Sequence, residues 1–141
     1  MKGDGFVVDT NVLISAALSE GAPPARVTLW VIAHARLIFT EQSFEDLRTR
    51  LWRPKFDRYL TMERRQQLHD FSAIADWVDI ADVATPVASR DPNDDMFVRA
   101  AIAGSVLWLV SGDRDLLDLP ALEMVTIISP AAMIEQIDGR R

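Results

Sequence analysis

Short apolar runs alternate with longer amphipathic segments along the chain of 141 residues. Apolar runs of four to six residues, bounded by polar ones, are typical of strands buried in a parallel sheet. Segments with apolar residues at helical spacing lie between them. The strands that we expect lie at 6–9, 36–40, 77–81, 106–111 and 124–129.

The expected helices have recognisable ends. A pair of prolines at 23 and 24 suits the first turn of a helix that continues to about residue 35. The segment 41–53 carries one apolar stripe, and Pro54 ends its helix. Further helices are expected at 11–18, 61–76, 94–104, 113–119 and 130–137. Because strand and helix alternate throughout, the pattern predicts an α/β fold with helices on both faces of an open, mostly parallel sheet.

The composition is that of a globular domain. Apolar residues make up 49% of the chain and charged residues 26%, and Trp30, Trp77 and Trp108 are expected in the core. The chain has no cysteine and no run near the roughly 20 apolar residues that span a bilayer, and its first residues lead us to expect no secretory leader. We therefore expect a soluble, cytoplasmic protein.

The formal net charge of −6 argues against a surface that binds nucleic acid over its whole extent. Basic residues are nevertheless concentrated in 48–65, where seven of them against two acidic ones give +5 and leave −11 for the rest. Such a segment can track an RNA backbone, and its aromatic side chains can stack on unpaired bases. Packing in a core or a dimer interface explains Trp52 equally well. The candidate RNA-binding residues are Arg48, Arg50, Trp52, Arg53 and Lys55.

Carboxylates recur where the expected strands end. Asp9 ends the first strand, Asp113 lies two residues beyond the fourth, and Asp94 opens the helix before that strand. Asp46 lies next to an apolar residue of the helix at 41–53, so it can face the same edge of the sheet. Open α/β sheets bind their ligands at this edge.

Each of these acids has a simpler explanation when taken alone. Asp91, Asp94 and Asp95 suit a helix N-terminus through capping and the helix dipole. Asp9 is harder to explain, because a charge directly after an apolar run is costly without a partner. Four converging carboxylates repel one another unless a cation binds, and ligand sets made only of oxygen favour Mg²⁺ or Mn²⁺ over Zn²⁺.

Other chemistries find little support in the sequence. No serine has a base at the spacing of a catalytic triad, the two histidines are isolated, and there is no glycine-rich phosphate loop. Phosphatases of the haloacid-dehalogenase type also begin with an aspartate at the end of the first strand. They need a second aspartate two residues later, where this chain has Asn11.

Four motifs occur in the order and spacing of PIN-domain proteins: VVDTNVLIS, SFEDLRTRLWRPKF, RDPNDDMFVRAAIAG and LVSGDRDLL. From residue 6 to about 137 the chain resembles this family, and in particular the VapC-like toxin components of prokaryotic toxin–antitoxin modules. The resemblance implies a three-layer α/β/α PIN-like fold with a central, mostly parallel sheet of about five strands. It also implies that residues 1–141 form a single domain.

The resemblance also assigns a site. The four acids of the family correspond to Asp9, Asp46, Asp94 and Asp113, and its supporting positions to Asn11, Glu45, Asp91, Ser111 and Asp115. The second acid is usually a glutamate, so Asp46 is shorter by one methylene, with Glu45 beside it. Ser111 stands where threonine is common and keeps the hydroxyl.

By this resemblance the protein is a ribonuclease that needs Mg²⁺ or Mn²⁺. It would cleave single-stranded or structured RNA by hydrolysis and leave a 5′-phosphate and a 3′-hydroxyl. A cognate antitoxin protein and a homodimer are also implied. The alternative, kept open by the shorter acid at Asp46, is a catalytically weak PIN-fold protein that acts through a partner.

Overall fold

The structure is a computed structural model that describes residues 4–84, 94–120, 122 and 124–139. Strands and helices alternate along these residues, as the sequence predicts. The elements are β1 (Gly5–Val8), α1 (Thr10–Leu18), α2 (Pro23–His34), β2 (Arg36–Phe39), α3 (Glu41–Leu51), a short 3₁₀ helix (Pro54–Phe56), α4 (Met62–Ile74), β3 (Asp76–Trp77), α5 (Asp95–Ala103), β4 (Trp108–Val110), α6 (Arg114–Leu117), β5 (Thr126–Ile128) and α7 (Pro130–Asp138).

The five strands form one parallel sheet in the order β3-β2-β1-β4-β5. The chain starts in the centre at β1, proceeds outward through β2 and β3, and then returns to add β4 on the other side of β1. The strand order therefore reverses between β1 and β4. Loops diverge at such a point and leave a crevice at the carboxyl ends of the two strands.

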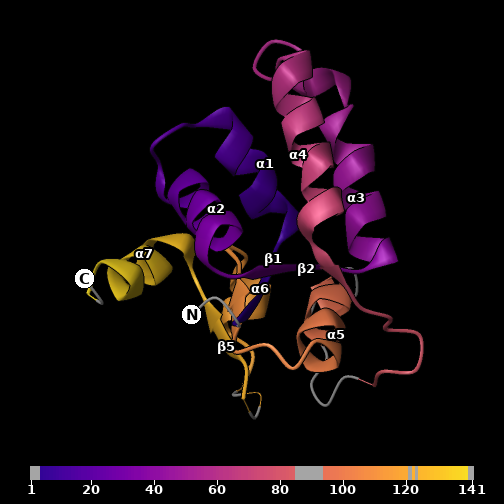
Figure 1. Cartoon of the computed structure of the whole chain (residues 1–141), viewed down its shortest axis with the longest axis vertical. Helices are drawn as coiled ribbons and strands as arrows, with labels where there is room; N and C mark the ends of the chain where they lie inside the picture. Colours follow the sequence, from indigo (N-terminus) through magenta and orange to yellow (C-terminus); the bar gives the residue numbers. More distant parts are fainter. Residues whose placement is uncertain (1–3, 85–93, 121, 123, 140–141) are drawn as a thin grey trace.

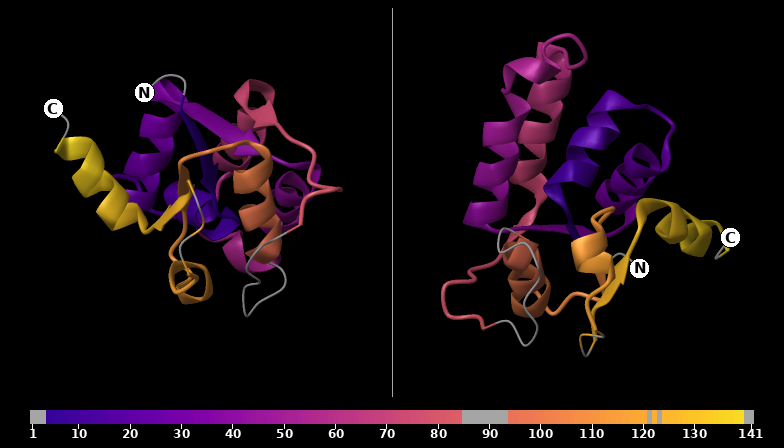
Figure 2. Two further views of the ribbon diagram at one scale, coloured as in Figure 1. Left: turned by 90° about the horizontal axis from the view of Figure 1, so that it is seen from below. Right: turned by 180° about the vertical axis from the view of Figure 1, so that it is seen from behind.

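Helices cover both faces of the sheet, which gives the predicted three-layer α/β/α architecture. Helices α1, α2, α3, α4 and α7 contribute to one apolar core, and α5 and α6 to the other. Successive strand residues point to opposite faces; thus Phe6 and Val8 enter the first core and Val7 enters the second. Figure 1 shows α5 across the strands from α1–α4, and the view from behind in Figure 2 agrees.

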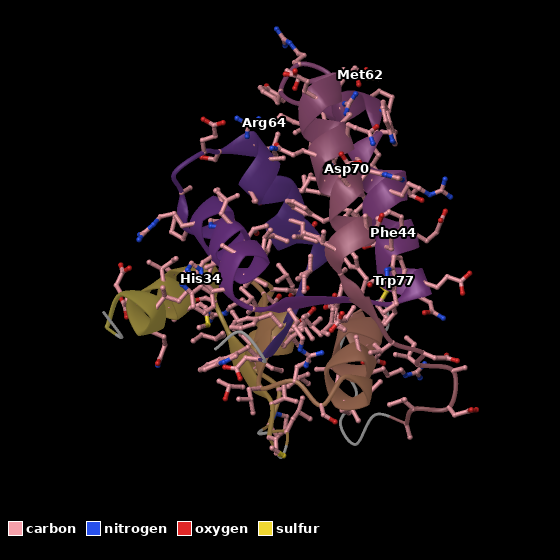
Figure 3. All side chains as sticks on the ribbon, in the orientation of Figure 1. His34, Phe44, Met62, Arg64, Asp70 and Trp77 are labelled. Carbon is pink, nitrogen blue, oxygen red and sulfur yellow. The ribbon has the colours of Figure 1, made fainter. Side chains whose placement is uncertain are left out.

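Helices α3 and α4 form a hairpin that extends away from the sheet (Figure 1). A capping box starts α3, because the backbone N–H of Ser43 donates to Thr40 Oγ1 and the N–H of Thr40 donates to Ser43 Oγ, both at 2.9 Å. In Figure 3, Phe44 and Trp77 lie at the base of the hairpin and Met62 lies at its tip. The capping box thus places the first turns of α3 next to the sheet.

The third strand differs from the prediction. It comprises only Asp76–Trp77 rather than 77–81. Beyond it, the N–H of Val78 still donates to the Phe39 carbonyl at 3.0 Å, and Asp79 then accepts the N–H of Ala81 in a turn. The core placement of Trp77 is also wrong: this side chain is 48% exposed, because β3 is an edge strand and its ring covers Phe39 and Phe44 from one side only.

Within the described part of the chain, no helix has the length and apolar character needed to cross a membrane.

Candidate metal centre

The carboxyl ends of β1 and β4 are joined by hydrogen bonds of Asp9, which directly follows β1, to Val110 at the end of β4 and to Ser111, which directly follows β4. The backbone N–H of Asp9 donates to the Val110 carbonyl at 2.9 Å. The Ser111 hydroxyl donates to Asp9 Oδ2 at 2.7 Å. Only 2% of Asp9 is exposed, and Ser111 is fully buried. A buried carboxylate is thereby fixed at the end of the first strand, as the sequence predicts.

The same serine connects Asp9 to the next acid. Ser111 Oγ accepts the backbone N–H of Asp113 at 3.0 Å. Asp113 caps α6, since its Oδ1 accepts the N–H of Asp115 at 2.9 Å. These bonds hold the loop after β4 in a tight turn that carries both Asp113 and Asp115.

The third acid comes from a separate segment of the chain, at the start of α5. Asp94 directly precedes α5 and is buried. One carboxylate oxygen from each of Asp94, Asp113 and Asp115 lies within 4.8 Å of the other two. Hard divalent cations prefer carboxylate oxygens as ligands. Asp115, expected only as a supporting residue, is thus a member of the acidic group itself.

The electrostatics of Asp9 reflect its place beside this group. Burial raises the pKa of Asp9 above the usual carboxyl value, and the negative charge of Asp113 raises it further. The hydrogen bonds from Ser111 and from the Asn11 backbone act in the opposite direction, and so does the positive charge of Arg50. Ionising Asp9 is therefore costly here, and a cation at the crevice would offset that cost.

The second acid of the expected set, Asp46, is linked by Arg50 to Asn11, two residues after Asp9. Arg50, one helical turn further along α3, donates from Nε to Asp46 Oδ1 at 3.1 Å. Its Nη1 donates to Asn11 Oδ1 at 2.7 Å. Asp46 Oδ2 is buried and has no hydrogen-bond partner within the part of the chain that the structure describes. One oxygen of Asp46 therefore holds Arg50, while the other remains available for a ligand.

Of the remaining supporting residues, Glu45 is not brought together with the acids. Glu45 forms an exposed ion pair with Arg48, one turn along α3, at 2.7 Å. Asp91 lies outside the described residues. The expected site therefore gathers around Asp9, Asp94, Asp113 and Asp115, with Asp46 and Asn11 at its border.

The basic segment is largely engaged in contacts within the chain. Arg64 pairs with Glu20, and Arg65 is buried between Asp57 at 2.9 Å and the Trp52 ring, whose centroid lies 5.1 Å from its guanidinium carbon. Trp52 is thus half exposed, with one side of its ring against an arginine. Arg53 and Lys55 are exposed near the tip of the hairpin.

Sequence reasoning missed the position of Arg50 inside the site. The sequence analysis named Arg50 only as one of five candidate RNA-binding residues. The spacing of four residues from Asp46 indicates a shared helix face. The contact with Asn11, which lies 39 positions away in the chain, has no signature in the sequence.

The family model described as "PIN domain" matches residues 5–115. Among solved structures, the chain is similar to VapBC2 from Rickettsia felis bound to a DNA fragment from their promoter, with 12% identity, a TM-score of 0.58, and coverage of 89% of this chain and 98% of that one. It is also similar to PAE2754 from Pyrobaculum aerophilum, with 15% identity, a TM-score of 0.53, and 96% coverage of both chains. At these identities the likeness shows the fold alone. No curated protein matches the chain.

Proposed function

Because this chain belongs to the PIN-domain family, we propose that it is an endoribonuclease that depends on Mg²⁺ or Mn²⁺ and that residues 1–141 form one PIN domain. The observation that carries this proposal is the acidic group of Asp94, Asp113 and Asp115 at the crevice between β1 and β4. Three oxygens within 4.8 Å of one another, with buried Asp9 alongside, fit a hard divalent cation.

The donor set passes a second test of fit. Asp46 Oδ2 is buried and lacks a hydrogen-bond partner among the described residues, although burying such an atom alone is costly. A cation beside it would satisfy that oxygen. Asp94, Asp113 and Asp115 would hold the ion, Asp9 would support it, and Asp46 would assist from α3.

A bound divalent cation would lower the pKa of an attacking water and neutralise charge on the scissile phosphate. The residues of the chain supply the geometry. Ser111 holds Asp9 and the loop of Asp113 in fixed positions through one hydroxyl. The buried carboxylates would also orient the water for attack opposite the leaving 3′-oxygen, and one of them would accept its proton.

We further propose that the protein is the toxin of a type II toxin–antitoxin module, with an antitoxin protein as its partner and RNA as its substrate. The fold is similar to that of VapBC2, which was solved with promoter DNA. This likeness supports a partner protein. A homodimer is part of the same proposal.

Cleavage of labelled single-stranded RNA tests the nuclease proposal. The purified protein is assayed with Mn²⁺ or Mg²⁺, with EDTA, and as the Asp94→Asn variant. We expect cleavage that requires the metal and falls by at least 100-fold in the variant, because one ligand of the group is lost. Asp138→Asn, in an exposed ion pair between α2 and α7, is the matched control. Equal cleavage by the protein and by Asp94→Asn would refute the proposal.

The second candidate is an interaction protein with weak catalysis. The ion pair of Asp46 with Arg50 favours it, because an acid that is already paired binds a cation less readily. This candidate predicts that Mn²⁺ raises the melting temperature while RNA stays intact. It also predicts that Asp94→Asn leaves antitoxin binding unchanged.

A further inference from the structure

Arg50 has an unusual position for a basic residue, because it lies at the border of an acidic centre. Its guanidinium spans from Asp46 on its own helix to Asn11 at the start of α1. Both Arg50 and Asp46 are about three-quarters buried, with side chains 26% and 24% exposed. A surface pair that merely stabilises a helix needs only the contact with Asp46. The contact with Asn11 instead holds the guanidinium close enough to Asp9 for its positive charge to act toward a lower pKa of that carboxyl.

The hydrogen bonds of Arg50 leave part of the guanidinium available. Among the described residues it uses Nε for Asp46 and one N–H of Nη1 for Asn11. An arginine has five N–H groups in one plane, so the second N–H of Nη1 and the two of Nη2 remain. Two neighbouring N–H groups of a guanidinium can bind one phosphate through two parallel hydrogen bonds.

A cleft lies next to Arg50. It has a volume of about 690 Å³ between α3 and α5, and Asp46, Arg50, Arg53 and Arg99 are among the residues that line it. Arg50 of α3 and Arg99 of α5 thus line one cleft, and its lining also includes Asp95, which directly follows Asp94 of the acidic group. The neighbouring Glu45 has its charge balanced by Arg48.

We infer that Arg50 binds a phosphate of the RNA next to the scissile bond, with the flanking nucleotide in the cleft between α3 and α5. The inference rests on the proposed nuclease function and names the residue that holds the substrate beside the metal centre. Asn11 and Asp46 Oδ1 act as positioning residues, because they fix the plane of the guanidinium. Arg48, Arg64 and Arg65 of the basic segment contribute less, since they do not line this cleft and are paired with acids of the chain.

The test separates substrate binding from metal binding. Arg50→Gln, Arg50→Lys and Asn11→Ala are compared with the unchanged protein, and Arg26→Gln, in the exposed pair with Asp138, is the matched control. KM and kcat for RNA cleavage are measured with Mn²⁺, and Mn²⁺ affinity is measured by titration calorimetry without RNA. The salt dependence of RNA binding is measured by fluorescence anisotropy in EDTA.

We expect Arg50→Gln to raise KM by about 10- to 100-fold, the effect of losing hydrogen bonds to a charged group. Mn²⁺ affinity should stay within about threefold. The slope of the logarithm of the RNA association constant against the logarithm of the salt concentration is negative, and it should become less steep by about 0.7, the value for one phosphate contact on a single strand. Arg50→Lys should raise KM less than Arg50→Gln does but still above the value of the unchanged protein, because an ammonium cannot reach Asp46, Asn11 and phosphate together. Asn11→Ala should raise KM less and add little to Arg50→Gln.

Two results would overturn the inference while the nuclease proposal stands. In the first, Arg50→Gln cleaves RNA with the KM and salt slope of the unchanged protein. In the second, Arg50→Gln binds Mn²⁺ more tightly and cleaves faster, so that Arg50 competes with the cation. Absence of cleavage and RNA binding by the unchanged protein would instead refute the proposed function, and this inference with it.

Discussion

The carboxylates at the strand ends and the basic segment at 48–65 are both dense in charge, yet the fold treats them in opposite ways. Asp94, Asp113 and Asp115 come from two separate segments and converge within 4.8 Å, with like charges facing one another. The basic residues lie within one segment of 18 residues, and several of them pair with acids nearby in the sequence, such as Arg48 with Glu45 and Arg65 with Asp57. Like charges are therefore gathered at the ends of β1 and β4, whereas four of the seven basic residues of 48–65 are paired with acids of the chain.

This contrast shows why density of charge along a sequence is a weak guide to function. Exposed charges cost little and pair with what is near, so a basic run forms without any ligand. Buried like charges are costly, and a fold retains them where a ligand offsets the cost. Asp9 shows that cost directly, since burial and Asp113 raise its pKa.

The largest effect that sharpens the contrast is expected for Asp113→Asn. Asparagine keeps the cap of α6, because its side-chain oxygen still accepts the N–H of Asp115. The charge that the cation needs is lost. We expect cleavage to fall on the order of 100-fold or more, while the melting temperature in EDTA stays equal or rises as repulsion with Asp9 disappears.

The decisive measurement for this variant is the pair of results taken together. Loss of cleavage with unchanged or higher melting temperature would mean that Asp113 is needed for catalysis and does not stabilise the fold. A melting temperature lower by several degrees would show that Asp113 is mainly structural. The contrast between the two regions would then fail.

A smaller effect concerns pH and Asp9. A carboxyl group whose folded-state pKa is raised contributes stability that is complete below its unfolded pKa and is lost as pH rises through the folded pKa. In EDTA, the Asp9 contribution should therefore decline from the usual carboxyl range upward. Asp9→Asn should remove this decline and increase the free energy of unfolding at neutral pH.

Denaturant unfolding over a pH series, with the variant subtracted from the unchanged protein, isolates this contribution from the other acids. Added Mn²⁺ should reverse the trend in the unchanged protein, because a cation stabilises the ionised form. If the difference between the two proteins does not vary with pH, the carboxyl of Asp9 has an ordinary pKa in the fold.

Much of the architecture was predictable because it depends on local patterns. Apolar runs bounded by polar residues located the strands, and prolines and caps located the helix ends. Asp9 was predicted as a site residue from its position directly after an apolar run. These features need only the periodicity of each element and the rule that ligands bind where strand order reverses.

The remaining features depend on contacts between distant segments. Nothing near Trp77 in the sequence indicates that β3 is an edge strand with one side of the tryptophan exposed. The network through Ser111 joins β1 to the loop after β4 across 102 positions, and Arg50 meets Asn11 across 39. Such contacts follow from the packed fold and have no periodicity to reveal them.

The smallest expected effect is that of Arg48→Gln, which tests the basic side of the contrast. Arg48 and Glu45 are both more than half exposed, and exposed ion pairs contribute about 0–1 kcal/mol. We expect the free energy of unfolding to change by less than about 0.5 kcal/mol and the RNA affinity by less than about twofold, since Arg48 does not line the cleft between α3 and α5. Anisotropy with labelled RNA and denaturant unfolding measure both. A tenfold loss of affinity, comparable to that expected for Arg50→Gln, would mean that RNA follows the exposed side of α3 and that pairing within the chain does not exclude a residue from the substrate surface.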